Sequence, residues 1–203
     1  MPRIRAANIA AHKEATRRDL LEAAGALFRA LGYQDTGLSD IASYAGIGRT
    51  TIYEYFSDKE DVLATLVEEA MPGVISGMLA DLPEEVGAGP RLAELLVRGT
   101  AFVSTDEALG AELMRQLPVL SPATQRRIRA AHAPLEHEIV ALCRQGMEEG
   151  VFRRLDPEET GRLVFAVMTA ASQSLIRDRD AKQRMHEAAD TLVAFVFRGI
   201  AAT

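Results

Sequence analysis

Apolar residues recur every three or four positions through most of the chain, the spacing of one face of an α-helix. The first such segment covers residues 16–31, and Gly32 follows where a helix commonly ends. Next, residues 36–46 open with a threonine and a glycine that can cap a helix, and residues 49–56 carry Ile52 and Phe56 one turn apart. No segment alternates apolar and polar residues as a strand would. The pattern predicts an all-α fold that opens with one longer and two short helices.

The rest of the chain has the same periodicity between recognisable breaks. We expect Pro72 and Gly73 to end one helix, and residues 82–90, rich in proline and glycine, to form a loop. Cap-then-proline pairs start two long helices, the first of them bent near Pro134. The helices expected after the first three cover residues 57–71, 91–104, 107–117, 121–150, 156–178 and 182–200.

The two short helices, joined by a glycine turn and braced by a longer helix, have the layout of a helix-turn-helix, whose second helix can enter a DNA major groove. With its apolar residues facing inward, a rotation of about 100° per residue directs Thr50 and Glu54 outward. Thr51 and Tyr53 then lie at the flanks, with Arg49 in the first turn. Arginine can bond guanine, while threonine and tyrosine can contact phosphates. A packing module whose exposed polar residues bind nothing remains the alternative on the pattern alone.

Net charge argues against a nucleic-acid partner, but the distribution of charge argues for one. The 203-residue chain is 48% apolar, enough for a sizeable core, and its 23 basic and 29 acidic residues give a net charge of −6. Residues 1–18, however, hold five basic residues and one acid, a local charge of about +4. We expect a basic N-terminal arm that can reach DNA. A solvated, disordered segment is the alternative.

Residues 16–69, above all "GYQDTGLSDIASYAGIGRTTIYEYFSDKEDVLATLVEE", resemble the DNA-binding domain of the TetR family of bacterial transcriptional regulators. The shared features include the aromatic residue after Gly32, the Ile-Ala pair of the second helix, the Ala-Gly turn and the Tyr55-Phe56 pair. The resemblance implies that the start of the recognition helix reads bases, that its tyrosines contact the backbone and nearby bases, and that a lysine clamps a phosphate. The implied DNA-contact residues are Ser39, Arg49, Thr50, Thr51, Tyr53, Tyr55 and Lys59.

Two residues depart from the family's pattern. Gly48 stands where a serine is common, so the recognition helix lacks a side-chain oxygen at its N-cap, a small loss because glycine is itself an acceptable cap. Glu54 directs a carboxylate toward the groove, where it repels phosphates unless it accepts a bond from a cytosine amino group. A third possible role for Glu54 is to pair with Arg49, or with another basic residue of the same module, and position it.

The resemblance also implies a helix-turn-helix domain with its arm, residues 1–57, followed by a larger helical effector-binding and dimerisation domain, residues 58–203. In this family the last two helices pair with their copies in a homodimer. The final helix here carries Phe195 and Phe197 beside the stripe that can face its own core, although packing within one chain is the alternative. The family binds small apolar or amphipathic effectors. Candidate pocket residues, each also an ordinary core residue, are Phe102, Met114, Leu117, Met147, Phe165 and Met168.

Other functions find little support. His132 and Glu136 lie one turn apart without a third metal ligand, so we expect neither a metal nor another cofactor. No phosphate-binding glycine loop or nucleophile elbow indicates an enzyme, and Cys143 is expected to be buried and inert. Apolar runs fall short of the roughly 20 residues that span a membrane, and the N-terminus has no signal-peptide core, so the expected location is the cytoplasm.

These observations predict a DNA-binding transcriptional regulator: a homodimeric repressor that binds a palindromic, double-stranded operator and is released by a small molecule. The alternative is a helical small-molecule or lipid-binding protein with a vestigial DNA-binding module. Salt-sensitive binding to duplex DNA distinguishes the two, because neutralised phosphates release counterions.

Overall fold

The computed structural model describes residues 2–83, 86–105, 115–176 and 181–202. Regular structure in these residues is helical, and the one extended pairing among them is an isolated antiparallel bridge between Phe152 and Ala201. The predicted all-α fold is confirmed. The α-helices are α1 (Pro2–Leu31), α2 (Leu38–Tyr44), α3 (Lys59–Leu79), α4 (Ala88–Thr105), α6 (Pro122–Glu148), α7 (Pro157–Ile176) and α8 (Ala181–Ile200), and the 3₁₀ helices include η1 (Thr51–Glu54) and η3 (Leu117–Val119).

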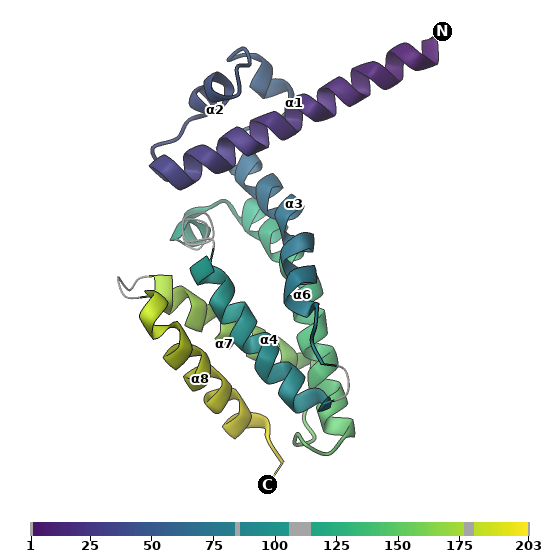
Figure 1. Cartoon of the computed structure of the whole chain (residues 1–203), viewed down its shortest axis with the longest axis vertical. Coiled ribbons are helices and arrows are strands. Elements are labelled where there is room, and N and C mark those ends of the chain that lie inside the picture. The colour runs from purple at the N-terminus through teal and green to yellow at the C-terminus, as the bar shows by residue number, and fades with distance from the viewer. Residues whose placement is uncertain (1, 84–85, 106–114, 177–180, 203) are drawn as a thin grey trace.

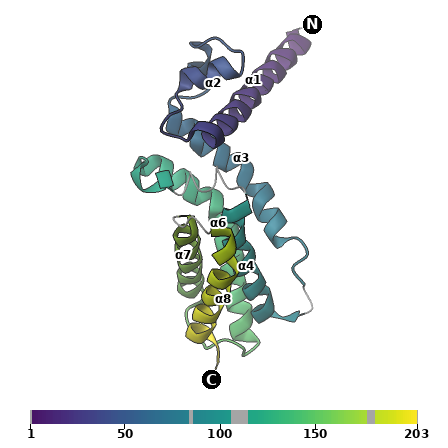
Figure 2. The same cartoon turned by 60° about the vertical axis from the view of Figure 1, so that its left-hand side comes forward.

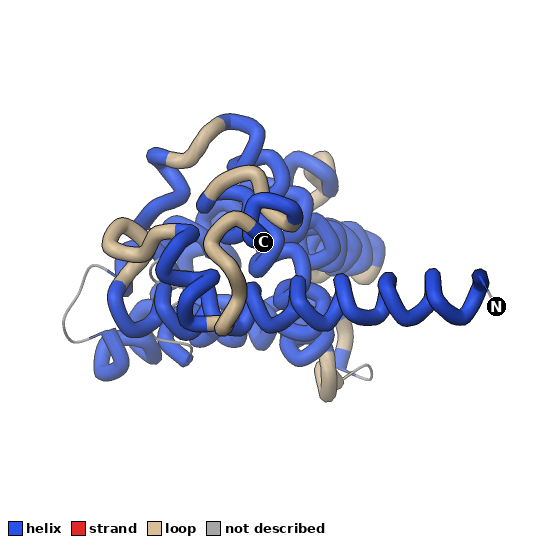
Figure 3. The backbone as a smooth tube through the Cα atoms, turned by 90° about the horizontal axis from the view of Figure 1, so that it is seen from above, coloured by secondary structure: helices blue, strands red, loops and turns tan. Residues whose placement is uncertain are grey.

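The helices form an elongated molecule with a helical unit at each end (Figure 1). At one end, α1, α2 and η1 make a small unit. At the other, α4, α7 and α8 pack with α6 in a bundle, and the chain ends there. The upper parts of α3 and α6 lie between the two units (Figure 2). Seen from above, the N-terminal part of α1 extends beyond the rest of the molecule (Figure 3).

The third helix of the small unit is a 3₁₀ turn, where the sequence predicted an α-helix over residues 49–56. Ile52 is fully buried and Phe56 is 3% exposed, which confirms the prediction that these two side chains face the core. The carbonyl of Gly48 accepts a bond from the Thr51 amide at 2.9 Å, an i to i+3 bond. In so short a segment most backbone N–H and C=O groups have no partner four residues away. They form i to i+3 hydrogen bonds instead, which wind the chain more tightly.

α1 begins at Pro2, whereas the sequence predicted its start near residue 16. The basic N-terminal segment is therefore a helical extension rather than a flexible arm. Residues 6–15 include five alanines and no glycine or proline, and proline is tolerated in the first turn of a helix. Gly32, with a φ of 87°, follows the helix as expected.

α3 continues through Pro72 to Leu79, although the sequence predicted its end at that proline. Pro72 is exposed, while Met71, Ile75 and Met78 are buried on both sides of it, so packing holds the helix together across the lost backbone bond.

α3 also begins one residue later than expected: Asp58, not Ser57, is its N-cap and accepts a bond from the Asp61 amide at 2.8 Å. Because of this length, α3 is the one helix among the described residues apolar enough to span a membrane, but it packs against α1, α4 and α6 as a core helix.

The bundle helices follow the expected pattern with small changes at their ends. α4 begins at Ala88, earlier than predicted, because the Ala88 amide donates to a carboxylate oxygen of Glu149 at 3.0 Å. The long helices expected from residues 121, 156 and 182 are present as α6, α7 and α8. Most of the helix expected over residues 107–117 falls on residues 106–114, outside the described part of the chain.

Small residues bring the bundle helices close together. A Cβ atom on Gly161 of α7 would lie 2.7 Å from the Cα of Val140 on α6, and one on Gly99 of α4 would lie 2.5 Å from the sulfur of Met168 on α7. Cys143 is fully buried in this core, and burial raises the pKa of its thiol to about 11. The expectation of an inert cysteine agrees with this environment.

Candidate DNA-binding surface and effector domain

The turn and 3₁₀ helix at residues 49–54 present a polar surface supported by buried anchors. Arg49, Thr50 and Glu54 are exposed, and Tyr53 is 61% exposed. The fully buried Ile52 fixes this segment against α1 and α2. The local fold therefore directs polar groups of the recognition segment into solvent together.

Arg49, Thr50 and Glu54 make no side-chain hydrogen bond or ion pair with any residue that the structure describes. The third role considered for Glu54, pairing with Arg49, is therefore not seen. Thr51 is half-buried, and a Cβ on Gly48 would lie 3.4 Å from its hydroxyl oxygen. The unpaired groups remain available to an external partner.

The other expected contact residues differ in exposure. Ser39 of α2 is partly buried, and Tyr55 is partly buried and packs against the core. Tyr44, at the end of α2, was not singled out from the sequence, yet it is 65% exposed. The sequence could have indicated this exposure, because Tyr44 lies outside the apolar stripe that contains Ile41 and directly before the glycine turn.

Lys59 is held within the protein rather than extended into solvent. Its ammonium donates to the carbonyl oxygens of Tyr33 at 2.6 Å and Gln34 at 3.2 Å, and lies 4.3 Å from the centre of the Tyr33 ring. Burial lowers the pKa of Lys59, and it raises that of Tyr33 to about 12. Two of the three ammonium donors are occupied, so a phosphate could use the remaining one.

The candidate effector residues are not gathered around any of the three hollows that the structure describes. Met168 is 4% exposed and faces Gly99. Four others are partly buried and pack against the core: Phe102, Leu117, Met147 and Phe165. Met114 lies outside the described residues. As for a metal, the described residues hold no group of three possible ligands, and His132 Nδ1 lies 2.7 Å from the carbonyl oxygen of Ile128.

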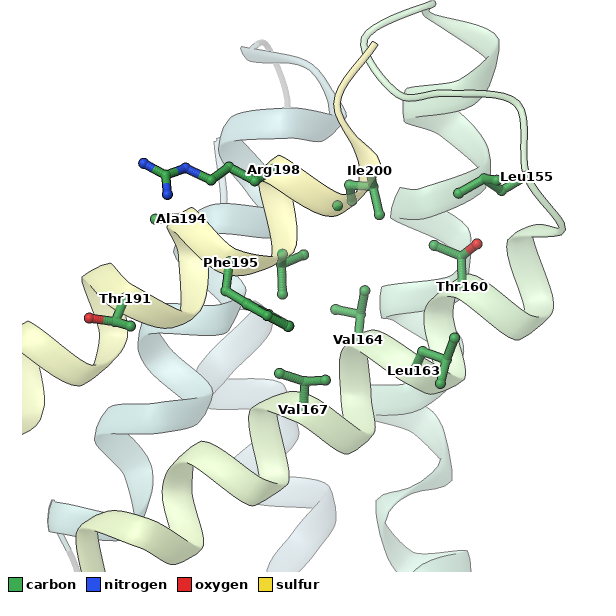
Figure 4. A pocket seen from close by; sticks show the side chains of 12 residues that line it. Leu155, Thr160, Leu163, Val164, Val167, Thr191, Ala194, Phe195, Arg198 and Ile200 are labelled. Atoms are coloured by element: carbon green, nitrogen blue, oxygen red, sulfur yellow. The ribbon is translucent and has the colours of Figure 1, made fainter. Parts of the chain in front are cut away.

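The largest of these hollows is an apolar groove of about 770 Å³ between α7 and α8. Figure 4 shows Phe195 directed from α8 toward Val164 and Val167 of α7, with Arg198 turned away. Phe195 is 65% exposed and Leu163 is 58% exposed. A surface with two large apolar side chains this exposed is typical of an interface.

Comparisons with known proteins agree with this arrangement. Residues 20–66 match the family described as bacterial regulatory proteins, tetR family, and residues 86–173 match the tetracyclin repressor-like C-terminal domain. The fatty acid metabolism regulator protein of Bacillus subtilis (strain 168) is 25% identical over 150 residues, 73% of this chain and 77% of that protein.

Two solved structures extend the likeness over nearly the whole chain. The regulator FadR from Bacillus subtilis in complex with stearoyl-CoA aligns with a TM-score of 0.72 at 22% identity, over 87% of this chain and 97% of that one. A transcriptional regulator from Saccharomonospora viridis in complex with choline aligns with a TM-score of 0.72 at 25% identity, over 94% and 100%.

A helix-turn-helix with an exposed polar recognition segment, carried on a separate helical bundle, defines a DNA-binding transcriptional regulator. Both units match the corresponding parts of a single family. The chain belongs to the TetR family of bacterial transcriptional regulators. Members of this family are regulators and not enzymes, in agreement with the prediction from the sequence.

Proposed function

We propose that the protein is a homodimeric repressor that binds a palindromic operator and is released by a small apolar or amphipathic molecule. The observation that carries the proposal is the exposed recognition segment, in which Arg49 and Thr50 have no partner within the described chain. Arginine donors at the start of such a segment suit the major-groove edge of guanine. We assign base contacts to Arg49, Thr50 and Thr51.

The remaining contacts are assigned to the DNA backbone. Tyr44 and Tyr53 are the most exposed aromatic residues of the small unit, and their hydroxyls suit phosphate oxygens. Ser39, Tyr55 and Lys59 complete the set with less exposure, and Lys59 has the weakest geometric support because it is bonded to two carbonyls. We thus assign DNA binding to residues 1–57 together with Lys59, and binding of the effector and of the second protomer to the remainder of residues 58–203.

Dimerisation is assigned to the groove between α7 and α8. A second copy would cover Leu163 and Phe195, which one protomer leaves in solvent. Two recognition segments related by two-fold symmetry then read half-sites about 34–36 Å apart. This arrangement requires a palindromic operator, and a regulator of bacterial transcription acts in the cytoplasm.

The effector is assigned to the bundle formed by α4, α6, α7 and α8. Two solved structures of similar proteins are complexes, one with stearoyl-CoA and one with choline. The abundance of methionine and phenylalanine among the candidate pocket residues favours an apolar portion in the ligand. We therefore choose stearoyl-CoA as the first probe.

Selection of bound fragments from a random duplex library tests the proposal. We expect a palindromic site whose affinity falls steeply between about 50 and 200 mM salt and falls again when stearoyl-CoA or a related acyl thioester is added. Binding of the thioester with no salt-sensitive binding to any duplex would favour the alternative, a helical small-molecule or lipid-binding protein with a vestigial DNA-binding module.

A further inference from the structure

α3 and α6 run side by side in the same direction, since their contacts advance together along both helices (Figures 1 and 2). At the upper level, Glu60 of α3 accepts bonds from the Ser121 amide at 3.0 Å and from the Thr124 hydroxyl at 2.7 Å. Ser121 is the N-cap of α6. The first turn of α6 is therefore fixed to the first turn of α3.

One turn further on, Arg127 of α6 binds three α3 side chains at once. Its Nε and Nη2 donate to the two carboxylate oxygens of Glu68 at 2.8 and 2.7 Å, a bidentate pair. Its Nη1 donates to Asp61 at 2.7 Å, and Nη2 also reaches the hydroxyl of Thr65 at 3.1 Å. We call this group the Arg127 latch: Arg127, Asp61, Thr65 and Glu68.

The part of α3 that carries the latch is also fixed to the small unit formed by α1, α2 and η1, which we call the DNA-binding unit. Lys59 donates to the carbonyl oxygens that follow α1, and Glu69 pairs with Arg17 of α1. The same loop is also bonded to the segment before α6, because the side-chain amide nitrogen of Gln34 donates to the side-chain carbonyl oxygen of Gln116 at 2.6 Å. Polar contacts thus connect the DNA-binding unit with residues 59–71 of α3, with the segment before α6 and with the first turns of α6.

Directly below the latch, both helices contain a proline. Pro72 leaves the carbonyl of Glu68 without its helical donor, and Pro134 does the same to Ala130. The two prolines line one groove of about 590 Å³ between α3 and α6. Each helix therefore lacks one backbone hydrogen bond at the same level, and both prolines border the same groove.

Below the prolines the two helices are fixed to the bundle instead. Arg98 of α4 donates to the carbonyl oxygens of Met78 and Ala80 at the end of α3. The lower half of α6 packs tightly on α7, where Val140 meets Gly161. In both helices, the residues before the proline are therefore bonded to the DNA-binding unit or to each other, and the residues after it contact the bundle.

We propose that the upper halves of α3 and α6 move as one body with the DNA-binding unit, held by the Arg127 latch, and bend relative to the bundle at Pro72 and Pro134. Arg127 is then a positioning residue: it sets the orientation of the recognition segment without touching DNA. The alternative is that α3 slides along a stationary α6, which would require the latch to break. Prolines in helices are established sites of bending, and a hinge needs only a few such residues.

Distances between pairs of spin labels test the proposal in the full-length protein. One label replaces Ala30 on α1; the second replaces either Ala130, above Pro134, or Ala141, below it, and all three positions are exposed. Labelled chains are diluted with unlabelled ones so that distances within one protomer dominate. The native Cys143 is fully buried and does not compete for the label.

We expect the Ala30–Ala130 distance to stay narrow and unchanged when the selected operator duplex is added, while the Ala30–Ala141 distance shifts. Arg127→Met should broaden the first distribution. Arg129→Met, a change at an exposed arginine of the same helix, is the matched control and should leave it unchanged. Replacing both prolines by alanine should reduce the shift of the second distance.

An equal shift of both distances, or no shift of either, would overturn the hinge. The test also separates the hinge from the proposed repressor function. If no duplex binds, the proposed repressor function is wrong, and the hinge is tested in the protein without DNA. In that case the Ala30–Ala141 distance distribution must be broader than the Ala30–Ala130 distribution. Replacing both prolines by alanine must then narrow the Ala30–Ala141 distribution.

Discussion

Three charged side chains in or next to the recognition segment differ in their environments. Arg49 and Glu54 project into solvent without partners in the described chain, whereas Lys59 bonds to backbone carbonyls. An unpaired charge at a groove-facing position affects mainly the affinity for DNA, whereas a charge that is hydrogen-bonded within the protein also affects the stability of the fold. Substitutions at these residues should therefore separate recognition from stability.

Arg49→Ala should cost about 1–3 kcal/mol of binding free energy at the selected operator and relax base preference, because a bidentate contact to guanine is lost. Lys59→Ala should weaken all duplexes about evenly, lower the salt slope by about one, and also lower the melting temperature. Fluorescence titrations with cognate and scrambled duplexes at two salt concentrations, with thermal melts, give these quantities. Identical profiles for the two variants would show that the base contact is misassigned.

Glu54→Gln distinguishes the two remaining roles of this carboxylate. If it only repels phosphates, the change should tighten cognate and scrambled duplexes alike. If it accepts a bond from cytosine, the cognate site alone should weaken, by about 1–3 kcal/mol. We expect the first result, because glutamate reads cytosine less often than arginine reads guanine. Unaltered binding to both duplexes would mean that Glu54 does not face DNA.

At the scale of elements, the junction of α3 and α6 is the most charged internal contact described. Hydrogen bonds from Arg127 lower the pKa of Glu68, and bonds from Ser121 and Thr124 lower that of Glu60. Burial acts to raise the pKa of Asp61, but bonds from the Ser57 amide and Arg127 outweigh it and the net direction is downward. All three carboxylates therefore bind protons less readily in the folded state than in the unfolded chain.

A lowered carboxylate pKa contributes stability that is present above the unfolded pKa and is lost as pH falls through the folded value. We expect the free energy of unfolding to decline below about pH 4 to 5, near the ordinary values for these groups. Arg127→Met should lower it by about 1–2 kcal/mol at pH 7, since the latch is partly exposed, and by less at pH 3. Denaturant titrations at both pH values measure the difference. Equal losses for Arg127→Met and the control Arg129→Met would contradict this account.

At the scale of the molecule, the recognition segment and the groove that we propose as the dimer interface lie in different parts of an elongated body. The polar recognition segment is in the small unit, and the apolar groove between α7 and α8 is in the bundle (Figures 1 and 4). In the proposed dimer, one recognition segment on one half-site is not sufficient for tight operator binding. Affinity for a palindrome depends on both recognition segments being linked through the bundle.

Phe195→Glu should convert the dimer to a monomer, because it puts a charge into an apolar interface, and should weaken operator binding by about 100-fold or more. Val119→Glu is the control: Val119 is 71% exposed and does not line the groove, so this change should alter neither property. Sedimentation and operator titration report the two effects. A Phe195→Glu protein that remains dimeric would exclude this groove as the interface.

Much of the fold and the recognition segment could be derived from the sequence, because both depend on local patterns. Helical periodicity identified the helices, Gly32 marked the end of the first, and Ile52 and Phe56 set the phase that exposes Arg49 and Thr50. The family resemblance in residues 16–69 agreed with the matched residues 20–66. These features are written in residues that are near one another along the chain.

Features that depend on distant residues required the tertiary structure. Buried Met71, Ile75 and Met78 carry α3 through Pro72, which local rules had made its end. The internal bonds of Lys59, the Arg127 latch and the shared level of Pro72 and Pro134 each join segments separated by at least 25 residues. Periodicity records which face of a helix is apolar, but only packing decides what that face, and the charges beside it, will meet.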